Sequence, residues 1–186
     1  MQLHVLPPKY AWLRREPGPR MLVEALKLYG VLEAKGTADN PQIMEWAKEV
    51  AKAPGLGWIG SWYDKDSIPW CGLFVGVVAA RAGKPIRSKL LSARDWLNWG
   101  SPVIGAPVLG DVLVFARGSG GHVGLYVAED RDAYHVLGGN QGDAVSIDRV
   151  SKDRFLGARN HYATAQPDNC RRIQMGADGP LSMNEA

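Results

Sequence analysis

The chain has 186 residues, of which 46% are hydrophobic and 22% are charged, and its formal net charge is +3. These values are typical of one globular domain that buries a core without disulfide bonds. The lysines and arginines form no dense stripe, which argues against nucleic acid as a partner. The two cysteines, Cys71 and Cys170, make no disulfide framework, and whether they pair stays open.

The first part of the chain predicts helices. Residues 1–19 contain four prolines and are expected to be irregular. Apolar residues at helical spacing predict a helix over residues 20–29. A second, amphipathic helix is expected to begin after Asn40, which suits an N-cap, and to end at the Pro-Gly pair of residues 54–55. Residues 55–66, rich in Gly and Trp, are expected to form a loop.

A buried helix that carries Cys71 in its first turn is the most informative feature of the sequence. Ser67 is a plausible N-cap, Pro69 suits the first turn, and an apolar run continues to Gly83. Free N–H groups and the helix dipole at this position favour a thiolate, so Cys71 is a candidate nucleophile. A lone cysteine in an apolar helix is more often a small core residue, so this interpretation needs a base. Cys170, near the polar end of the chain, is interpreted as incidental.

The second part of the chain predicts an antiparallel sheet. Residues 92–95 match a capping box for a short helix that Gly100 closes. Strand-like segments follow at residues 110–115, 123–128, 134–137 and 144–147. Helices followed by strands indicate the α+β class. We expect an irregular segment with one helix over 1–35, a main domain over 36–163 and a polar tail over 164–186.

His122 is the candidate base. If the hairpin that follows it is symmetric about Arg131, His122 lies opposite Asn140, with Cβ atoms roughly 4.5–5.5 Å apart. The carbonyl of Asn140 would then accept the Nδ1 proton of His122 and leave Nε2 to take a proton from Cys71. A Cys-His-Asn set is suited to acyl transfer through a thioester, with backbone N–H groups near Cys71 holding the oxyanion.

The same register weakens the case for a second histidine. It pairs His135 with Val127 and places it on the opposite face, although a bulge would overturn this argument. Taken singly, His122 is as well explained as a solvent-facing strand residue, and Asn140 as a turn former. Only their opposition across the hairpin favours the catalytic interpretation.

Several motifs occur together between residues 36 and 160: Pro69-Trp70-Cys71-Gly72-x-Phe74, Ala93-Arg94-x-Trp96-Leu97-x-Trp99-Gly100, Gly110-Asp111-Val112, Gly121-His122-Val123-Gly124 and Gly138-Gly139-Asn140-Gln141. This set resembles the NlpC-type cell-wall cysteine peptidases, above all a branch common in phage and prophage genomes, and is similar to the related CHAP amidases. The resemblance implies a reduced papain-like fold with Cys71 as nucleophile, His122 as base and Asn140 as the residue that orients it. It implies no cofactor, and peptidoglycan as the substrate, cleaved at an amide bond.

Other residues are candidates for contacting this substrate. They are Trp62, Tyr63, Asp66, Trp70 and Gly121. The aromatic residues, together with Trp58, would form a wall for peptide or sugar, or would simply pack in the core. Asp64 and Asp66 would bind a free amine, or would be solvated loop charges. Asp111 is interpreted as a cap of the turn into a strand.

No metal site is expected, because no His/Cys cluster has zinc spacing. The acidic run at residues 129–132 permits a Ca²⁺ loop, but a charged hairpin tip explains it more simply.

The expected function is therefore a peptidoglycan hydrolase, as a phage endolysin or a tail-associated lysin. The N-terminus has no secretory signal pattern and no apolar span, so no membrane is expected as a partner. The protein would stay in the host cytoplasm until a holin releases it, or travel on a phage particle with other tail proteins, and act in the cell wall. One alternative is a non-catalytic wall-binding or tail module of the same fold; another is an acyltransferase or amidase with a different amide substrate.

Overall fold

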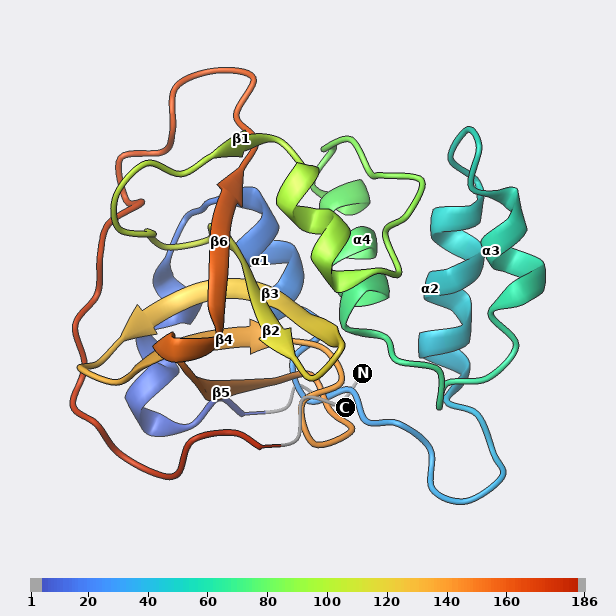
Figure 1. The fold of residues 1–186 in the computed structure, drawn as a ribbon, viewed down its shortest axis with the longest axis horizontal. Coiled ribbons are helices and arrows are strands. Elements are labelled where there is room, and N and C mark those ends of the chain that lie inside the picture. Colours follow the sequence, from blue (N-terminus) through green and yellow to red (C-terminus); the bar gives the residue numbers. More distant parts are fainter. Residues whose placement is uncertain (1–4, 184–186) are drawn as a thin grey trace.

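The computed structural model describes residues 5–183 and contains a curved antiparallel sheet with helices packed beside it (Figure 1). The helices are α1 (Arg20–Leu26), α2 (Pro41–Ala51), α3 (Gly57–Trp62) and α4 (Cys71–Arg81), with 3-10 helices η1 (Pro8–Arg15), η2 (Ala93–Asn98) and η3 (Lys152–Arg154). The strands are β1 (Ser101–Pro102), β2 (Val112–Arg117), β3 (Gly120–Glu129), β4 (Ala133–Gly138), β5 (Ser146–Ser151) and β6 (Phe155–Asn160). The sheet order is β1-β6-β2-β3-β4-β5. Every strand pair is antiparallel, so the predicted α+β class with an antiparallel sheet is confirmed.

The helical part follows the sequence prediction with three corrections. The predicted helix α2 is present, and the side chain of Asn40 accepts the N–H of Gln42 at 2.7 Å as its N-cap. The predicted irregular segment contains η1, because Pro8 occupies a first-turn position where no N–H is needed. The predicted loop 55–66 contains α3, and α1 ends earlier than expected, at Leu26.

One predicted cap is wrong, and another lacks its side-chain hydrogen bond. Helix α4 begins at Cys71 itself, with Trp70 and not Ser67 at the cap position. Ser92 is the N-cap residue of η2, as predicted, but its side chain makes no capping hydrogen bond; its backbone carbonyl accepts the N–H of Asp95 at 3.0 Å. Cys71 nevertheless lies in the first turn of its helix, as expected.

The core is divided between the two faces of the sheet. The larger apolar cluster packs α4, α1 and α2 against residues such as Val123 and Leu125 of β3. The smaller cluster lies on the other face and includes Phe115 and Tyr126. Alternate residues of each strand thus point to opposite faces, as the two-residue period of a strand requires. Both β1 and β6 were missed by the sequence prediction.

The register of β3 with β4 matches the predicted hairpin only in part. Leu125 pairs with Leu137, as symmetry about Arg131 requires. A bulge follows, so His135 pairs with Ala128 and the predicted pairing with Val127 is wrong.

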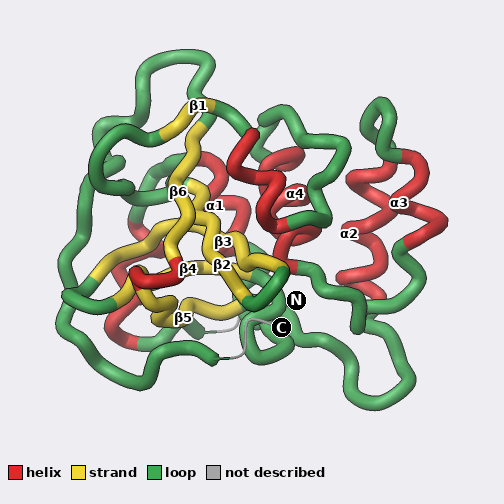
Figure 2. The backbone as a smooth tube through the Cα atoms, viewed as in Figure 1, coloured by secondary structure: helices red, strands yellow, loops and turns green. Residues whose placement is uncertain are grey.

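The C-terminal segment is polar and irregular, and it lies against the body of the protein. Residues 164–183 run as a loop along one side of the molecule (Figure 2). The N–H of Glu129 donates to the carbonyl of Ile173 at 2.8 Å, and the N–H of Met175 donates to the carbonyl of Glu129 at 2.9 Å. Within residues 5–183, no helix has the length and apolar character needed to cross a bilayer.

Candidate functional site

Cys71 is the first residue of α4 and lines a groove of about 570 Å³. The residue is 4% exposed. The groove is lined by Pro69, Cys71, Leu91, Ser92, Ala93, Arg94, Arg117, Gly118, Ser119, Gly120 and Gly121. The helix start packs tightly, because a Cβ at Gly72 would collide with the carbonyl oxygen of Leu90. This close approach places the thiol against the segment before η2.

The surroundings of the sulfur act on its ionisation in opposite directions. Burial raises the pKa of the Cys71 thiol, while hydrogen bonds from the backbone N–H groups of Val123 and Gly72 and the charge of Arg117 lower it. Burial outweighs the others, so the expectation that the helix start alone favours a thiolate is corrected. Burial therefore opposes loss of the thiol proton, so a nucleophilic role for Cys71 needs a base.

His122 lies on β3, one residue before the N–H group that contacts this sulfur, and its side chain is buried. Its ring stacks on that of Phe115, its cross-strand partner, with centroids 6.4 Å apart. Its Nε2 atom lies 2.9 Å from Oε1 of Gln141. The imidazole is therefore fixed by packing on one side and by an amide on another.

The orientation of the Gln141 amide determines which nitrogen of His122 carries the proton. The Nε2 atom of Gln141 donates to the carbonyl of Val136 at 3.1 Å and to that of Ser146 at 2.9 Å. Only the NH₂ end of an amide can donate to two carbonyls, so Oε1 must face His122. An amide oxygen is an acceptor, so Nε2 of His122 is the protonated nitrogen and Nδ1 is the basic one.

Asn140 has a different role from the predicted one. Its Oδ1 atom accepts the backbone N–H of Trp70 at 3.1 Å, so it anchors the residue before α4 and does not orient His122. Asn140 also has a φ of 57°, a left-handed conformation that turns the chain after β4. The prediction that its carbonyl binds Nδ1 of His122 is wrong, and Gln141, the next residue, holds Nε2 instead.

Two glycines make this arrangement possible. A Cβ at Gly138 would lie 2.6 Å from Oε1 of Gln141 and 3.2 Å from Nε2 of His122. A Cβ at Gly139 would lie 2.6 Å from Cβ of Phe74 in α4. The Gly-Gly pair therefore lets the chain after β4 pass between the histidine and the cysteine helix.

The predicted substrate-contact residues are only partly brought together. Gly121 lines the groove with Cys71. Trp70 is buried and its Nε1 donates to Glu33 at 3.0 Å, while the buried Tyr63 donates its hydroxyl to the carbonyl of Ile68 at 2.9 Å. Asp66 is also buried, so direct contact of these three side chains with a substrate is corrected to a structural role.

Asp66 holds a loop in place. Its Oδ2 atom accepts the N–H groups of Ala34 and Asn40, each at 2.8 Å. A carboxylate committed to two backbone donors in the interior does not bind a substrate amine. Asp111 likewise accepts the N–H of Val108 at 2.8 Å, in keeping with the predicted turn cap, and burial raises its pKa to about 6.

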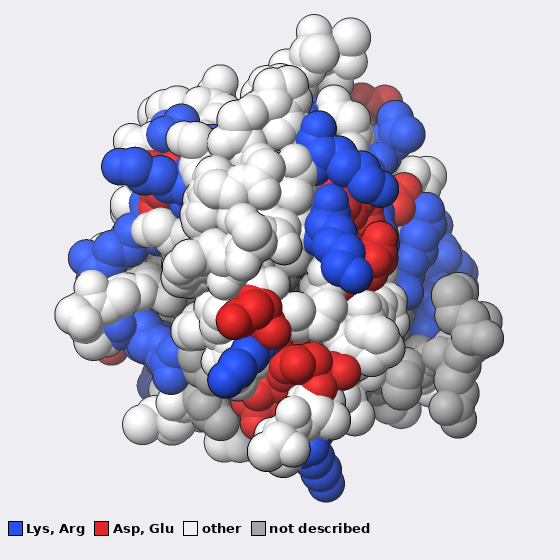
Figure 3. Space-filling model, turned by 90° about the vertical axis from the view of Figure 1, so that its right-hand side faces the viewer, with Lys and Arg blue, Asp and Glu red and all other residues white. Residues whose placement is uncertain are grey.

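The exposed aromatic residues lie on α3. Trp58 is 44% exposed and Trp62 is 55% exposed, with ring centroids 6.0 Å apart. Figure 3 views the molecule from the side on which α2 and α3 lie, and basic and acidic side chains there flank a broad uncharged band. Neither tryptophan lines the Cys71 groove.

The acidic side chains at the tip of the β3–β4 hairpin form ion pairs. Asp130 binds Arg149 at 2.7 Å and His135 at 2.9 Å, and Glu129 binds Lys152 at 2.7 Å. Within residues 5–183, no group of three or more His, Cys, Asp or Glu side chains is arranged to hold a metal ion.

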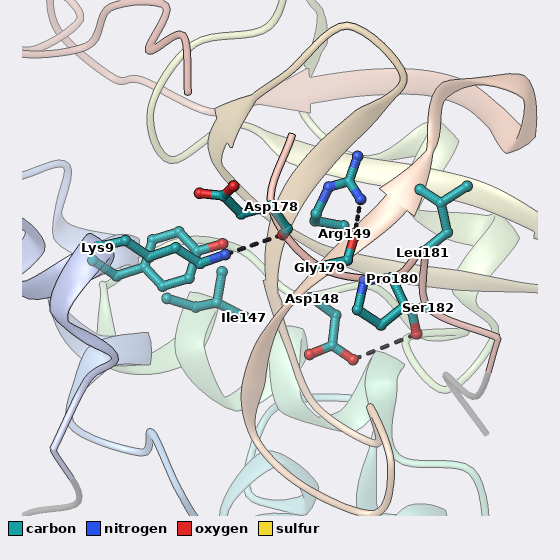
Figure 4. Close-up of a pocket in the computed structure, with 10 residues that line it drawn as sticks. Lys9, Ile147, Asp148, Arg149, Asp178, Gly179, Pro180, Leu181 and Ser182 are labelled. Atoms are coloured by element: carbon teal, nitrogen blue, oxygen red, sulfur yellow. Dashed lines mark hydrogen bonds between the residues drawn. The ribbon is translucent and has the colours of Figure 1, made fainter. Parts of the chain in front are cut away.

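A second hollow, of about 260 Å³, lies over β5 (Figure 4). Residues 178–182 line one side of it and are held there by the protein body: Lys9 donates to the carbonyl of Asp178 at 3.3 Å, and the N–H of Ser182 donates to the carbonyl of Arg149 at 2.7 Å. It shares no lining residue with the Cys71 groove. The C-terminal segment therefore forms one wall of this hollow.

Comparison of the chain with protein-family models and with curated proteins finds no match.

Proposed function

We propose that this protein is a cysteine peptidase or amidase of reduced papain-like fold that cleaves an amide bond of bacterial peptidoglycan. The fold supports this proposal because a thiol at the start of a helix packs against an antiparallel sheet that carries a histidine. The substrate class rests on the motifs around Cys71, His122 and Gly138, which resemble those of NlpC-type enzymes. An endolysin or a tail-associated lysin is the proposed biological setting.

The observation that carries the proposal is the hydrogen bond between His122 and Gln141. It fixes the tautomer in which Nδ1 is basic, on a ring whose neighbour Val123 gives its N–H to the Cys71 sulfur. Acyl transfer by cysteine requires a base held in one tautomer, and β3, the strand that carries His122, packs against the helix that carries the thiol.

In the proposed reaction, Nδ1 of His122 takes the Cys71 proton as the sulfur attacks the amide carbon. The new C–S bond and the oxyanion form together, and backbone N–H groups beside the sulfur, such as those of Cys71 and Gly72, hold the negative charge. Nδ1 then gives the proton to the leaving nitrogen as the C–N bond breaks, which leaves a thioester.

Water completes the cycle. Nδ1 removes a proton from a water molecule that attacks the thioester, the C–S bond breaks, and the proton returns to the sulfur. A free carboxylic acid leaves and the thiol is restored, so each turnover consumes one water molecule and no cofactor.

The test is digestion of purified peptidoglycan, followed by mass spectrometry of the fragments. The wild type and a Cys170→Ser control should release the same new amine and carboxyl ends, and these ends name the bond. Cys71→Ala and His122→Ala should release none. Full lytic activity of either variant would contradict the proposal. Binding to cell walls without cleavage by the wild type would support the non-catalytic alternative instead.

A further inference from the structure

The groove above Cys71 has a positive lining. Arg94 and Arg117 line it together with Ser92 and Ser119, and no Asp or Glu of the described residues does so. A concave, one-signed surface concentrates ligands of the opposite charge. The groove is therefore suited to an anionic group.

The two arginines are not equivalent. Arg94 uses its guanidinium to hold the turn that follows β2, with Nε donating to the carbonyl of Gly120 at 2.6 Å and Nη2 to that of Gly118 at 3.5 Å. Its guanidinium is thus hydrogen-bonded to backbone carbonyl groups. Arg94 is a positioning residue for the Gly118–Gly121 rim of the groove.

Arg117 is differently placed. It is the last residue of β2, is half-buried, and pairs with Gly120 across the turn. No carboxylate within residues 5–183 forms an ion pair with it. Its charge nevertheless acts on the sulfur, because it is one of the influences that lower the pKa of Cys71. Because Arg117 and Cys71 line the same groove, a group bound to this guanidinium would lie in the groove that holds the thiol.

We propose that the Cys71 groove selects substrates with a free carboxylate beside the scissile amide, and that Arg117 binds this carboxylate. The inference rests on the proposed function and deepens it by naming the charge of the substrate. A planar guanidinium binds a carboxylate through two parallel hydrogen bonds and discriminates against a neutral carboxamide. Peptide stems of cell walls offer both forms, since their carboxyl groups are either free or amidated.

The experiment compares two synthetic muropeptides that differ only in whether the stem-peptide carboxyl groups are free or amidated. The wild type should cleave the free acid with a kcat/KM about tenfold or more above that of the amidated form. Arg117→Ala should lose this preference by slowing cleavage of the free acid alone, and Arg117→Lys should retain part of it.

Arg131→Ala is the matched control, because it removes one positive charge from a side chain that is 90% exposed at the β3–β4 turn. It should leave the preference unchanged. Equal cleavage of both muropeptides by the wild type, or an equal loss on both in Arg117→Ala, would overturn the inference and leave the proposed function intact.

A binding measurement separates the inference from the proposed function. The inactive Cys71→Ala variant should bind the free acid more tightly than the amidated form, by calorimetry, and Cys71→Ala/Arg117→Ala should bind both equally. If the wild type cleaves neither muropeptide but this difference in affinity persists, the proposed function fails and the carboxylate site stands. Equal affinities in Cys71→Ala would contradict the carboxylate site itself.

Discussion

The side-chain oxygen of Gln141 lies 2.9 Å from Nε2 of His122, and the amide nitrogen of Gln141 is held by two backbone carbonyls. Neither the glutamine nor the histidine can change its hydrogen-bonding role without breaking a buried bond. This relationship gives the imidazole of His122 a defined tautomer, with Nδ1 as the basic nitrogen, and it leads to the first prediction.

Replacement of Gln141 by Ala should lower kcat on peptidoglycan fragments by about 100-fold, because the tautomer and orientation of His122 would no longer be fixed. KM should change little, since the side chain does not line the groove. Gln141→Glu should keep the contact but favour a protonated ring, which moves the acid limb of the pH–rate profile to higher pH. Steady-state kinetics over pH 5–9 measure both effects.

Ser146→Ala is the control for Gln141. It removes one hydroxyl that lies 3.1 Å from the Gln141 amide nitrogen and leaves both carbonyl acceptors in place. Its kcat and pH profile should stay near those of the wild type. A Gln141→Ala variant that is less stable but retains full kcat would mean that Gln141 has a structural role only.

The sequence predicted that a polar residue just after β4 holds His122, but it identified Asn140 instead of Gln141. The hairpin register correctly pairs Leu125 with Leu137, and extending it places Asn140 opposite His122. The strand ends at Gly138, however, and the left-handed conformation of Asn140 breaks the alternation on which the argument depended. A positive φ at one non-glycine residue is not visible in a periodicity pattern, so Gln141 was missed.

Asn140 gives the second prediction. Both Asn140→Gly and Asn140→Ala leave the N–H of Trp70 without its side-chain acceptor, which should cost about 1–3 kcal/mol. Ala should cost about 1 kcal/mol more than Gly, because only Gly adopts a φ of 57° without strain. Urea denaturation measures both. Equal stability of Asn140→Gly and Asn140→Ala would show that the backbone at this position relaxes.

The buried network around His135 gives the third prediction. Nδ1 of His135 accepts the hydroxyl of Tyr10 at 2.7 Å, and Nε2 donates to Asp130 at 2.9 Å. Burial lowers the pKa of His135, more than the bond to Asp130 raises it. The hydrogen bond from Arg149 is the main reason that the pKa of Asp130 is also lowered.

The sign of the pH dependence follows from these shifts. In the unfolded chain, His135 binds a proton below about pH 6.5. In the folded protein, burial disfavours the protonated form. The free energy of unfolding should therefore fall as pH drops from 7 to 5. The lowered pKa of Asp130 adds a further loss at more acidic pH. Urea midpoints at pH 7, 6 and 5 should fall less steeply in His135→Asn than in the wild type. Parallel slopes in the two proteins would show that His135 does not cause the pH dependence of stability.

The helices and strands were predicted to different extents for a physical reason. Helix α2 carries its own start and stop signals in Asn40 and in the Pro-Gly pair after it, and α4 is a continuous apolar run. Strand β6 has no such pattern: most of its residues are half-buried, it includes Gly157, and its pairing with β2 is irregular. Its position depends on long-range pairing, which local sequence does not encode.

The most direct test of the catalytic pair is the alkylation rate of Cys71 at pH 7, measured by intact mass in a Cys170→Ser background. If His122 takes the thiol proton, iodoacetamide should react with the wild type about tenfold or more faster than with His122→Ala, because burial alone keeps the thiol protonated. Gln141→Ala should fall between them. Equal rates in all three proteins would contradict the assignment of His122 as the base of Cys71.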